Sequence, residues 1–300
     1  MQTPTLRQLQ FLTAIAETGS FSRAAEHCHV TQPTLSNAIK EVETLLGIQL
    51  VERHARGIEL TAAGEIAADR AKTILASAQD LVAATRQTAR PLSSTFRLGA
   101  IPTIAPFLLP SVLKPLRNQY PDLRLFISED ITERLLESLR ARTLDAAIIA
   151  LPWPSHGIET QTLFDDEFVV IAPAGHALEQ ANLTAPSDLL GEDLLLLDDG
   201  HCLREQTVTL CKLGSDCDRT DVTASSLLTL AYMVEGGLGV SMLPRLAVDA
   251  GLTKGMDLFM KGFAQSAVGR QIGIAWRAGS PRQEEARLIG EMCVQHRPSV

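Results

Sequence analysis

The fold of this chain is decided by Phe21-Ser22-Arg23-Ala24-Ala25-Glu26-His27-Cys28 and, two residues later, by Thr31-Gln32-Pro33-Thr34-Leu35-Ser36. The first stretch predicts a short helix in which two small alanines permit close packing. The second predicts the start of a longer helix, because Thr31 or Gln32 can cap it and Pro33 suits a first turn, where no backbone donor is needed. An earlier helix ends at Gly19, and its apolar face consists of Leu9, Phe11, Leu12 and Ile15. Three helices with this tight turn predict a helix-turn-helix.

Two different faces are predicted for the third helix. Its apolar residues recur at helical spacing and are expected in the core: Leu35, Ile39, Val42 and Leu46. The opposite face is small, polar and weakly cationic, and carries Pro33, Ser36, Asn37, Lys40 and Thr44. Such a face suits a helix that lies in the major groove of DNA.

A basic hairpin is predicted after the third helix. Residues 50–61 read as two short strands around a turn that carries Arg53 and Arg56. Both arginines are placed to touch phosphate or a minor groove. A three-helix scaffold that binds protein is the alternative, but the order of helices, turn and basic wing favours DNA binding.

The charge of the chain is unevenly distributed. Its 300 residues carry a net charge of −8, and 45% of them are hydrophobic, which is ample for a core. Residues 1–90 hold nine Lys/Arg and nine Asp/Glu, so the remainder holds 18 against 26. Repulsion from this acidic body disfavours loose DNA binding, so specific contacts and multivalency must supply the affinity.

Nothing in the sequence predicts a membrane or secreted protein. No apolar stretch approaches the roughly 20 residues of a bilayer span, and Met1-Gln2-Thr3-Pro4-Thr5 lacks a signal-peptide layout. Five cysteines, an odd count in a long chain, do not suggest a disulfide scaffold. We therefore expect a soluble, cytoplasmic protein.

A long helix is predicted between Ala62 and about Ala89. Ala67, Ile74 and Leu81 repeat every seven residues, a heptad seam that favours a homodimer. A single helix packed on its own domain is the alternative. Residues 91–94 then read as a hinge.

The N-terminal part resembles the LysR family of transcriptional regulators. The resemblance rests on Leu9-Gln10-Phe11, Gly19-Ser20-Phe21, Ala24-Ala25, Thr31-Gln32-Pro33-Thr34-Leu35-Ser36, Leu50-Val51-Glu52-Arg53 and Leu60-Thr61-Ala62-Ala63-Gly64. It implies that Gln32, Pro33, Thr34 and Ser36 contact base edges, with Arg53 on the wing. Asn37 stands where many members carry a basic residue.

The rest of the chain alternates apolar strand-like runs with helices, the pattern of mainly parallel α/β sheets. The resemblance implies two Rossmann-like subdomains, as in a solute-binding protein, with the chain crossing near Asp165 and returning near Val268. We therefore predict a winged helix-turn-helix at residues 1–61, a linker helix at 62–90 and an α/β regulatory domain at 91–300. Its first subdomain comprises residues 95–164 and 269–300, and its second residues 165–268.

One cysteine is placed for thiolate chemistry. Asp198-Asp199-Gly200-His201-Cys202-Leu203-Arg204 follows a predicted strand and opens a helix, so Cys202 lies in a first turn, where the helix dipole favours an anion. His201 and Arg204 also favour the thiolate, the form that attacks an oxidant. Asp198 and Asp199 oppose it unless they only cap the helix.

Cys211 and Cys217 are the candidate partners of Cys202. In one straight helix the Cα atoms of Cys202 and Cys211 are roughly 13 Å apart, whereas a disulfide tolerates no more than about 7 Å. Such a pair is poorly suited to a structural disulfide but well suited to a redox switch, because forming the bond forces this segment to refold. Alternatively, a cysteine can be a small core residue without redox chemistry, and we assign this role to Cys28 and Cys293. Bound zinc is another, although the cysteine spacings do not resemble structural zinc sites.

The segment from Asp199 to Cys211 resembles the OxyR branch of the family, the hydrogen peroxide sensors. This resemblance implies that Cys202 is the peroxidatic thiol, that Cys211 resolves it, and that Thr103, Thr132, His201 and Arg270 support the peroxide site. Thr103 and Thr132 each follow a predicted strand and open a helix, so both face the crevice of Cys202; a simple helix N-cap is the alternative for each.

We therefore expect a non-enzymatic regulator without metal or cofactor, switched by peroxide. The resemblance implies homodimers or homotetramers on promoter DNA, contact with RNA polymerase and reduction by cellular thiols. Two alternatives stay open: a LysR-type regulator with inert cysteines that binds a small organic effector in the same crevice, and a thiol peroxidase, a true enzyme.

Overall fold

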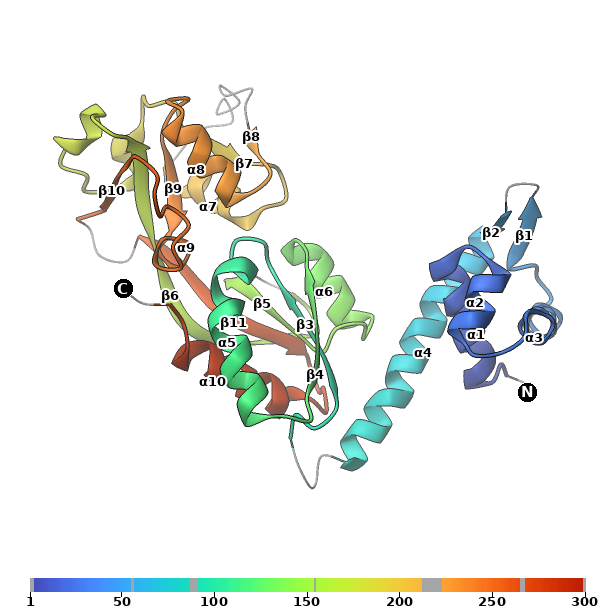
Figure 1. Ribbon diagram of the computed structural model, residues 1–300. Coiled ribbons are helices and arrows are strands. Elements are labelled where there is room, and N and C mark those ends of the chain that lie inside the picture. The colour runs from blue at the N-terminus through green and yellow to red at the C-terminus, as the bar shows by residue number, and fades with distance from the viewer. Residues whose placement is uncertain are drawn as a thin grey trace. The chain divides into compact units, whose positions relative to one another are not determined.

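The computed structural model describes residues 3–54, 57–86, 91–153, 155–211, 223–264 and 268–298 (Figure 1). The chain forms two compact units. The N-terminal unit comprises residues 1–89 together with residues 140–143, and the C-terminal unit comprises residues 90–139 and 144–300.

The N-terminal unit is a winged helix-turn-helix, as predicted. Its elements are α1 (Leu6–Thr18), α2 (Phe21–His27), α3 (Gln32–Leu46), β1 (Val51–His54), β2 (Gly57–Leu60) and α4 (Ala62–Arg86). The Thr31 side chain accepts a hydrogen bond from Thr34 N and so caps α3, with Pro33 in the first turn. Gly19 ends α1 in the left-handed conformation, at φ +60°. The local signals in the sequence therefore set these helix ends.

The core of the N-terminal unit differs from the prediction at one position. Leu35, Ile39 and Val42 are buried, but Leu46 is 48% exposed, so its predicted place in the core is wrong. Leu46 lies in the last turn of α3, which Gly47 ends, and the chain returns to the core only at the buried Leu50. Helical periodicity alone does not show where a helix extends beyond the core on which it packs.

Helix α4 packs one of its faces on this core. Ala68 and Ala71 are buried against it, whereas Ile66, Ile74 and Leu81 are 64%, 47% and 68% exposed. No helix in the described ranges, α4 included, is long and apolar enough to cross a membrane.

The C-terminal unit has an α/β architecture. Its elements are β3 (Thr95–Ala100), α5 (Ala105–Gln119), β4 (Arg124–Glu129), α6 (Thr132–Arg140), β5 (Ala146–Leu151), β6 (Ile158–Pro173), the 3₁₀ turns η1 (Ala177–Glu179) and η2 (Pro186–Leu189), β7 (Leu196–Leu197), α7 (Cys202–Leu210), β8 (Thr223–Ala224), α8 (Leu227–Glu235), β9 (Ser241–Pro244), α9 (Arg245–Asp249), β10 (Leu258–Gly262), β11 (Gly269–Arg277) and α10 (Gln283–Gln295).

The main sheet is mixed, which corrects the expectation of mainly parallel sheets. Its order is β10-β6-β11-β5-β3-β4, and β9 also pairs with β6. Only β3 with β4 and β3 with β5 are parallel within it. β6 and β11 run antiparallel to each other and to their other neighbours.

Two separate hydrophobic cores divide the C-terminal unit into two α/β subdomains. The first core lies around β3, β5, α5 and α10, and the second around β9, α8 and the outer half of β6. Along β6, Phe164 belongs to the first core and Phe168 to the second. β6 and β11 therefore connect the subdomains. The residue boundaries given above remain predictions.

A buried polar network ties the start of the C-terminal unit to its last helix. Arg282 Nε donates to Glu285 Oε2 at 2.5 Å, Arg282 Nη2 donates to Ser94 Oγ at 3.2 Å, and Arg282 Nη1 donates to the Thr95 carbonyl. The other oxygen of Glu285 accepts from Leu92 N at 2.8 Å. Both Arg282 and Glu285 are buried, at 4% and 2% exposed. The first and last elements of the unit are therefore fastened to each other.

Candidate functional site

Cys202 is the first residue of α7, as predicted. Gly200 precedes it at φ +87°, a backbone conformation that glycine adopts without strain. His201 is the N-cap, but its side chain makes no capping hydrogen bond. The Cys202 side chain is buried, with 6% of the residue exposed, and packs in the first core.

Side chains from distant segments surround this thiol. Thr103 follows β3, Thr132 opens α6 and Arg270 is the second residue of β11. Arg270 Nη1 donates to Thr103 Oγ1 at 2.8 Å, and Arg270 Nη2 donates to the Thr103 carbonyl at 3.1 Å. Thr132 Oγ1 is buried and has no well-formed hydrogen bond within the described ranges. The first subdomain thus contributes two threonines, and a crossing strand contributes a cation.

The pKa of Cys202 is raised, which corrects the prediction that its surroundings favour the thiolate. Burial is the largest cause, because it disfavours the charged form, and Glu205 raises the pKa further. The positive charge of Arg270, the Thr132 hydroxyl and the backbone N–H of Leu203 act in the opposite direction and lower it. The helix N-terminus therefore helps the thiolate but does not outweigh burial.

The residues beside Cys202 in the sequence act differently from the prediction. Arg204, expected to favour the thiolate, donates through Nε to Asp199 at 2.8 Å and through Nη1 to the Leu197 carbonyl at 3.2 Å. Asp198 accepts a short hydrogen bond from the Thr223 hydroxyl. The half-buried His201 side chain makes no hydrogen bond within the described part of the chain. The cation that acts on Cys202 is Arg270.

Cys211 lies at the other end of the same helix. It is the C-cap of α7, fully buried, and it packs in the second core. Over the nine steps from Cys202, a helical rise of 1.5 Å separates the two Cα atoms by roughly 13 Å. Among the described residues no disulfide joins Cys202, Cys211, Cys28 or Cys293, and Cys217 lies outside the described residues. The two candidate redox residues therefore occupy different cores.

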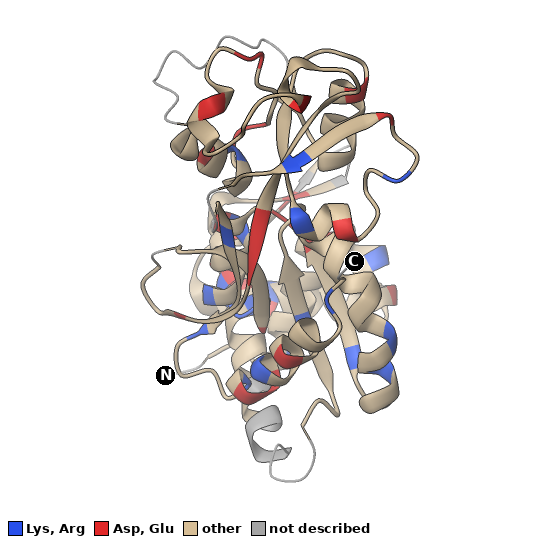
Figure 2. Ribbon diagram, turned by 90° about the vertical axis from the view of Figure 1, so that its left-hand side faces the viewer, with Lys and Arg blue, Asp and Glu red and all other residues tan. Residues whose placement is uncertain are grey.

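A pocket of about 910 Å³ adjoins the crossing strands and the outer face of α7. β6 and β11 line it with Asp165, Glu167, Arg270 and Gln271, among others, and α7 contributes Gln206. Gln206 Oε1 is buried without a hydrogen-bond partner in the described residues. In the ribbon of Figure 2, acidic and basic residues of the C-terminal unit are interspersed along the chain. Among the described residues, no group of three His, Cys, Asp or Glu side chains is arranged to hold a metal.

The predicted DNA-contact residues of α3 lie on its outer face. Gln32, Pro33, Thr34, Asn37 and Lys40 are exposed, and Ser36 is half-buried. Gln32 is already positioned, because its Oε1 accepts from Ser22 Oγ of α2 at 3.1 Å. Arg53 lies on β1, but its side chain and the whole of Arg56 fall outside the described residues.

Comparison with known proteins identifies the family. Residues 6–65 match the model for the bacterial regulatory helix-turn-helix protein, lysR family, and residues 89–298 match the LysR substrate binding domain. A probable hydrogen peroxide-inducible genes activator of Mycobacterium leprae is 40% identical over 96% of this chain and 94% of its own length. Full-length OxyR from Pseudomonas aeruginosa, solved as a variant, superposes with a TM-score of 0.79 at 34% identity, covering 100% of this chain and 99% of that chain. The chain belongs to the OxyR branch of the LysR family.

A second solved structure is similar to almost the whole of this LysR regulator. It is an OxyR variant from Corynebacterium glutamicum with hydrogen peroxide bound, 35% identical, with a TM-score of 0.67 and coverage of 98% of this chain and 93% of that chain. Together these matches confirm the predicted fold class, an α/β regulatory part behind a winged helix-turn-helix.

Sequence reasoning missed one residue of the thiol site in this LysR regulator. Asp166 is 3% exposed, and its Oδ2 accepts from Arg270 Nε at 3.0 Å. The signal was present in the sequence, because Asp165-Asp166-Glu167 interrupts the apolar run of β6. A buried acidic residue within a strand needs a partner, but only the register of β6 with β11 shows that the partner is Arg270.

Proposed function

We propose that this OxyR-type transcriptional regulator senses hydrogen peroxide by oxidation of Cys202 and formation of a disulfide with Cys211. The observation that carries the proposal is the placement of one buried thiol at each end of α7, with Arg270 and Thr132 beside the first and Thr103 hydrogen-bonded to Arg270. The hydrogen peroxide named for the relatives from Mycobacterium leprae and Corynebacterium glutamicum supports the choice of oxidant.

The proposed oxidation balances with the two thiols and one molecule of hydrogen peroxide. The Cys202 thiolate attacks one peroxide oxygen, the O–O bond breaks, and the other oxygen leaves as hydroxide, which takes up a proton to become water. Cys202 is then a sulfenic acid. The Cys211 thiol attacks this sulfur and expels a second water, so two thiols lose two electrons to one peroxide. We expect Arg270 and the Thr132 hydroxyl, which both lower the pKa of Cys202, to stabilise the negative charge that develops on the leaving oxygen.

Bond formation remodels the regulatory part. The two Cα atoms, roughly 13 Å apart along a helix, must approach to within about 7 Å. Because Cys202 packs in the first core and Cys211 in the second, α7 must unwind and at least one thiol must leave its core. This rearrangement is the switch that changes how the regulator sits on DNA. One oxidation serves one signal, so the chain acts as a sensor and not as an enzyme.

The partners follow from the same assignment. Promoter DNA is contacted by the outer face of α3 and by the wing. The residues concerned are Gln32, Pro33, Thr34, Ser36, Asn37 and Lys40 of α3, and Arg53 and Arg56 of the wing. Cellular thiol reductants restore the two thiols, and the DNA-bound regulator contacts RNA polymerase to control genes for peroxide removal.

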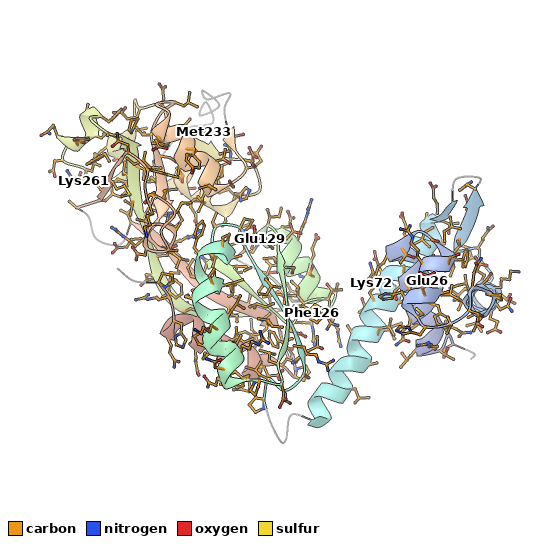
Figure 3. All side chains as sticks on the ribbon, viewed as in Figure 1. Glu26, Lys72, Phe126, Glu129, Met233 and Lys261 are labelled. Atoms are coloured by element: carbon orange, nitrogen blue, oxygen red, sulfur yellow. The ribbon has the colours of Figure 1, made fainter. Side chains whose placement is uncertain are left out.

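Exposed apolar side chains support self-association into dimers and tetramers. Along α4, Ile66, Ile74 and Leu81 stand out from the N-terminal core. In the C-terminal unit, β4 is an edge strand of the sheet and carries Phe126 (labelled in Figure 3) at 62% exposed and Ile127 at 42%. Exposed apolar side chains along a helix and a sheet edge are typical of surfaces that a second copy covers.

Thiol mapping after brief peroxide exposure tests the proposal. We expect the wild-type protein to lose two thiols, with the peptides of Cys202 and Cys211 linked. Cys202→Ser should abolish the loss, and Cys211→Ser should stop at the sulfenic acid. Cys293→Ser is the matched control, because Cys293 is fully buried with a pKa raised to about 12, and it should respond as wild type. Linkage of Cys202 to Cys217 would overturn the assignment of Cys211, and an unreactive Cys202 would overturn the sensor itself.

The pocket beside α7 favours a second candidate, a regulator that binds a small organic effector. Its volume of about 910 Å³ and the unpartnered Gln206 Oε1 fit such a ligand. The test adds the small-molecule fraction of a cell extract to a Cys202→Ser, Cys211→Ser double variant and measures its DNA contacts. If the protein binds an organic effector, these contacts still change; if it senses peroxide through the two cysteines, they do not.

A further inference from the structure

Asp166 and Arg270 form a buried pair between the two strands that connect the subdomains. They are direct partners in the antiparallel register of β6 and β11, and they are 3% and 4% exposed. The strands come very close here, because a Cβ at Gly269 would lie 2.5 Å from the Asp166 carbonyl oxygen. Only glycine fits at position 269, so the neighbouring Arg270 is held directly opposite Asp166.

Both oxygens of the Asp166 carboxylate are occupied. Oδ2 accepts from Arg270 Nε at 3.0 Å, and Oδ1 accepts from Leu246 N at the start of α9, at 2.9 Å. Asp166 therefore fixes Arg270 against an element of the second subdomain. The far side of the same guanidinium donates twice to Thr103 of the first subdomain.

We propose that Asp166 is a positioning residue for the thiol site: by holding Arg270 Nε, it keeps the guanidinium on Thr103 and beside Cys202. The proposal rests on the assignment of Cys202 as the reacting thiol. Without Asp166 the guanidinium would still carry its charge, but it would have no fixed direction within a buried site. Asp166 thus acts on the thiol through Arg270 and touches neither thiol nor peroxide.

Replacing the carboxylate distinguishes positioning from mere charge balance, because the two roles shift the thiol in opposite directions. An asparagine has one acceptor oxygen, so it cannot accept from both Leu246 N and Arg270 Nε, and its NH₂ group faces one of these donors. If Asp166 positions Arg270, Asp166→Asn releases the guanidinium and disfavours the Cys202 thiolate. If Asp166 only neutralises Arg270, the same change leaves an uncompensated cation in place and favours the thiolate.

The experiment titrates the Cys202 thiolate by its absorbance near 240 nm in full-length wild type, Asp166→Asn, Arg270→Met and the double variant. Each protein is compared with its own Cys202→Ser counterpart, so that the difference reports Cys202 alone. We expect Asp166→Asn to lower the thiolate fraction at a fixed pH by about tenfold, equivalent to one pKa unit. The double variant should match Arg270→Met, because Asp166 acts only through Arg270. A higher thiolate fraction in Asp166→Asn, or additive effects in the double variant, would overturn the proposal.

Two further variants guard against a purely structural explanation. Asp166→Glu keeps the charge but displaces the carboxylate, so positioning predicts a shift in the same direction as asparagine and charge balance predicts none. Asp145→Asn breaks a second, largely buried ion pair, with Arg282, in which the side chains are 11% and 5% exposed, and it should lower stability without changing the Cys202 titration. Because the titration uses no peroxide, its outcome is readable even if the wild-type thiol proves unreactive in the mapping experiment.

Discussion

The DNA-contact surface and the thiol site are built in opposite ways. The outer residues of α3 come from one short stretch of sequence and are mostly exposed. The thiol site draws Thr103, Thr132, Asp166, Cys202 and Arg270 from segments spread over 168 positions, 103 to 270, and all five are buried. A surface site thus depends on a helix and its caps, whereas a buried site depends on the register of strands far apart in the chain.

The two kinds of site also differ in what the surroundings do to a side chain. Burial governs Cys202, whose pKa it raises, and the cation and hydroxyl beside it offset only part of that effect. Cys293 shows burial acting alone, with its pKa raised to about 12. The two buried thiols thus differ in their surroundings, because charged and hydroxyl groups act on Cys202 whereas burial alone acts on Cys293.

The largest effects are expected from breaking one core at a time. Leu35→Ala opens a cavity in the N-terminal core and Leu108→Ala opens one in the first core of the C-terminal unit, and both leucines are fully buried. Each should lower the free energy of unfolding of its own unit by about 2–5 kcal/mol. Hydrogen exchange read separately on the two units, together with the rate of Cys202 oxidation, checks this. Leu35→Ala should abolish operator binding without slowing oxidation; a slowed thiol would contradict the separation of the two sites.

The next effect concerns the pH dependence of the thiol site. Because the pKa of Cys202 is raised above its ordinary value of 9.0, the thiolate is a small fraction at neutral pH and grows as the pH rises. The oxidation rate constant should therefore increase about tenfold per pH unit between pH 6 and 9. Stopped-flow measurements at fixed peroxide concentration would show this slope, and a plateau near pH 7 would mean that Arg270 and Thr132 outweigh burial.

The smallest effect is expected at the surface site. Lys40→Ala removes one exposed cation from α3 and should weaken operator binding several-fold. The magnitude of the slope of log K (the operator association constant) against log salt concentration should fall by about one. Lys254→Ala, an equally exposed lysine of the C-terminal unit, is the matched control and should leave the slope unchanged. Equal effects of the two variants would mean that α3 does not face phosphate.

The contrast also explains which parts of the molecule could be predicted from the sequence. Capping residues such as Thr31 and Gly19 act within a few positions, so the end of α1 and the start of α3 followed from the sequence. Cys202 at the start of α7 was equally local. Asp166 was missed, and the effect of Arg204 was assigned wrongly, because both depend on which strand or side chain lies opposite. The mixed sheet was not predicted for the same reason, because a hydropathy pattern indicates a strand but not the direction in which it pairs.

The network around Arg282 and Glu285 has a practical consequence for work on this regulator. It links Leu92, close behind the linker, to α10 near the end of the chain, across 193 positions. The network therefore holds the start of β3 against the first turn of α10, so the first strand of the regulatory part depends on its last helix. A fragment that stops before Glu285 would lose this closure and leave Arg282 buried without its nearest carboxylate, so truncations for crystallisation should retain α10.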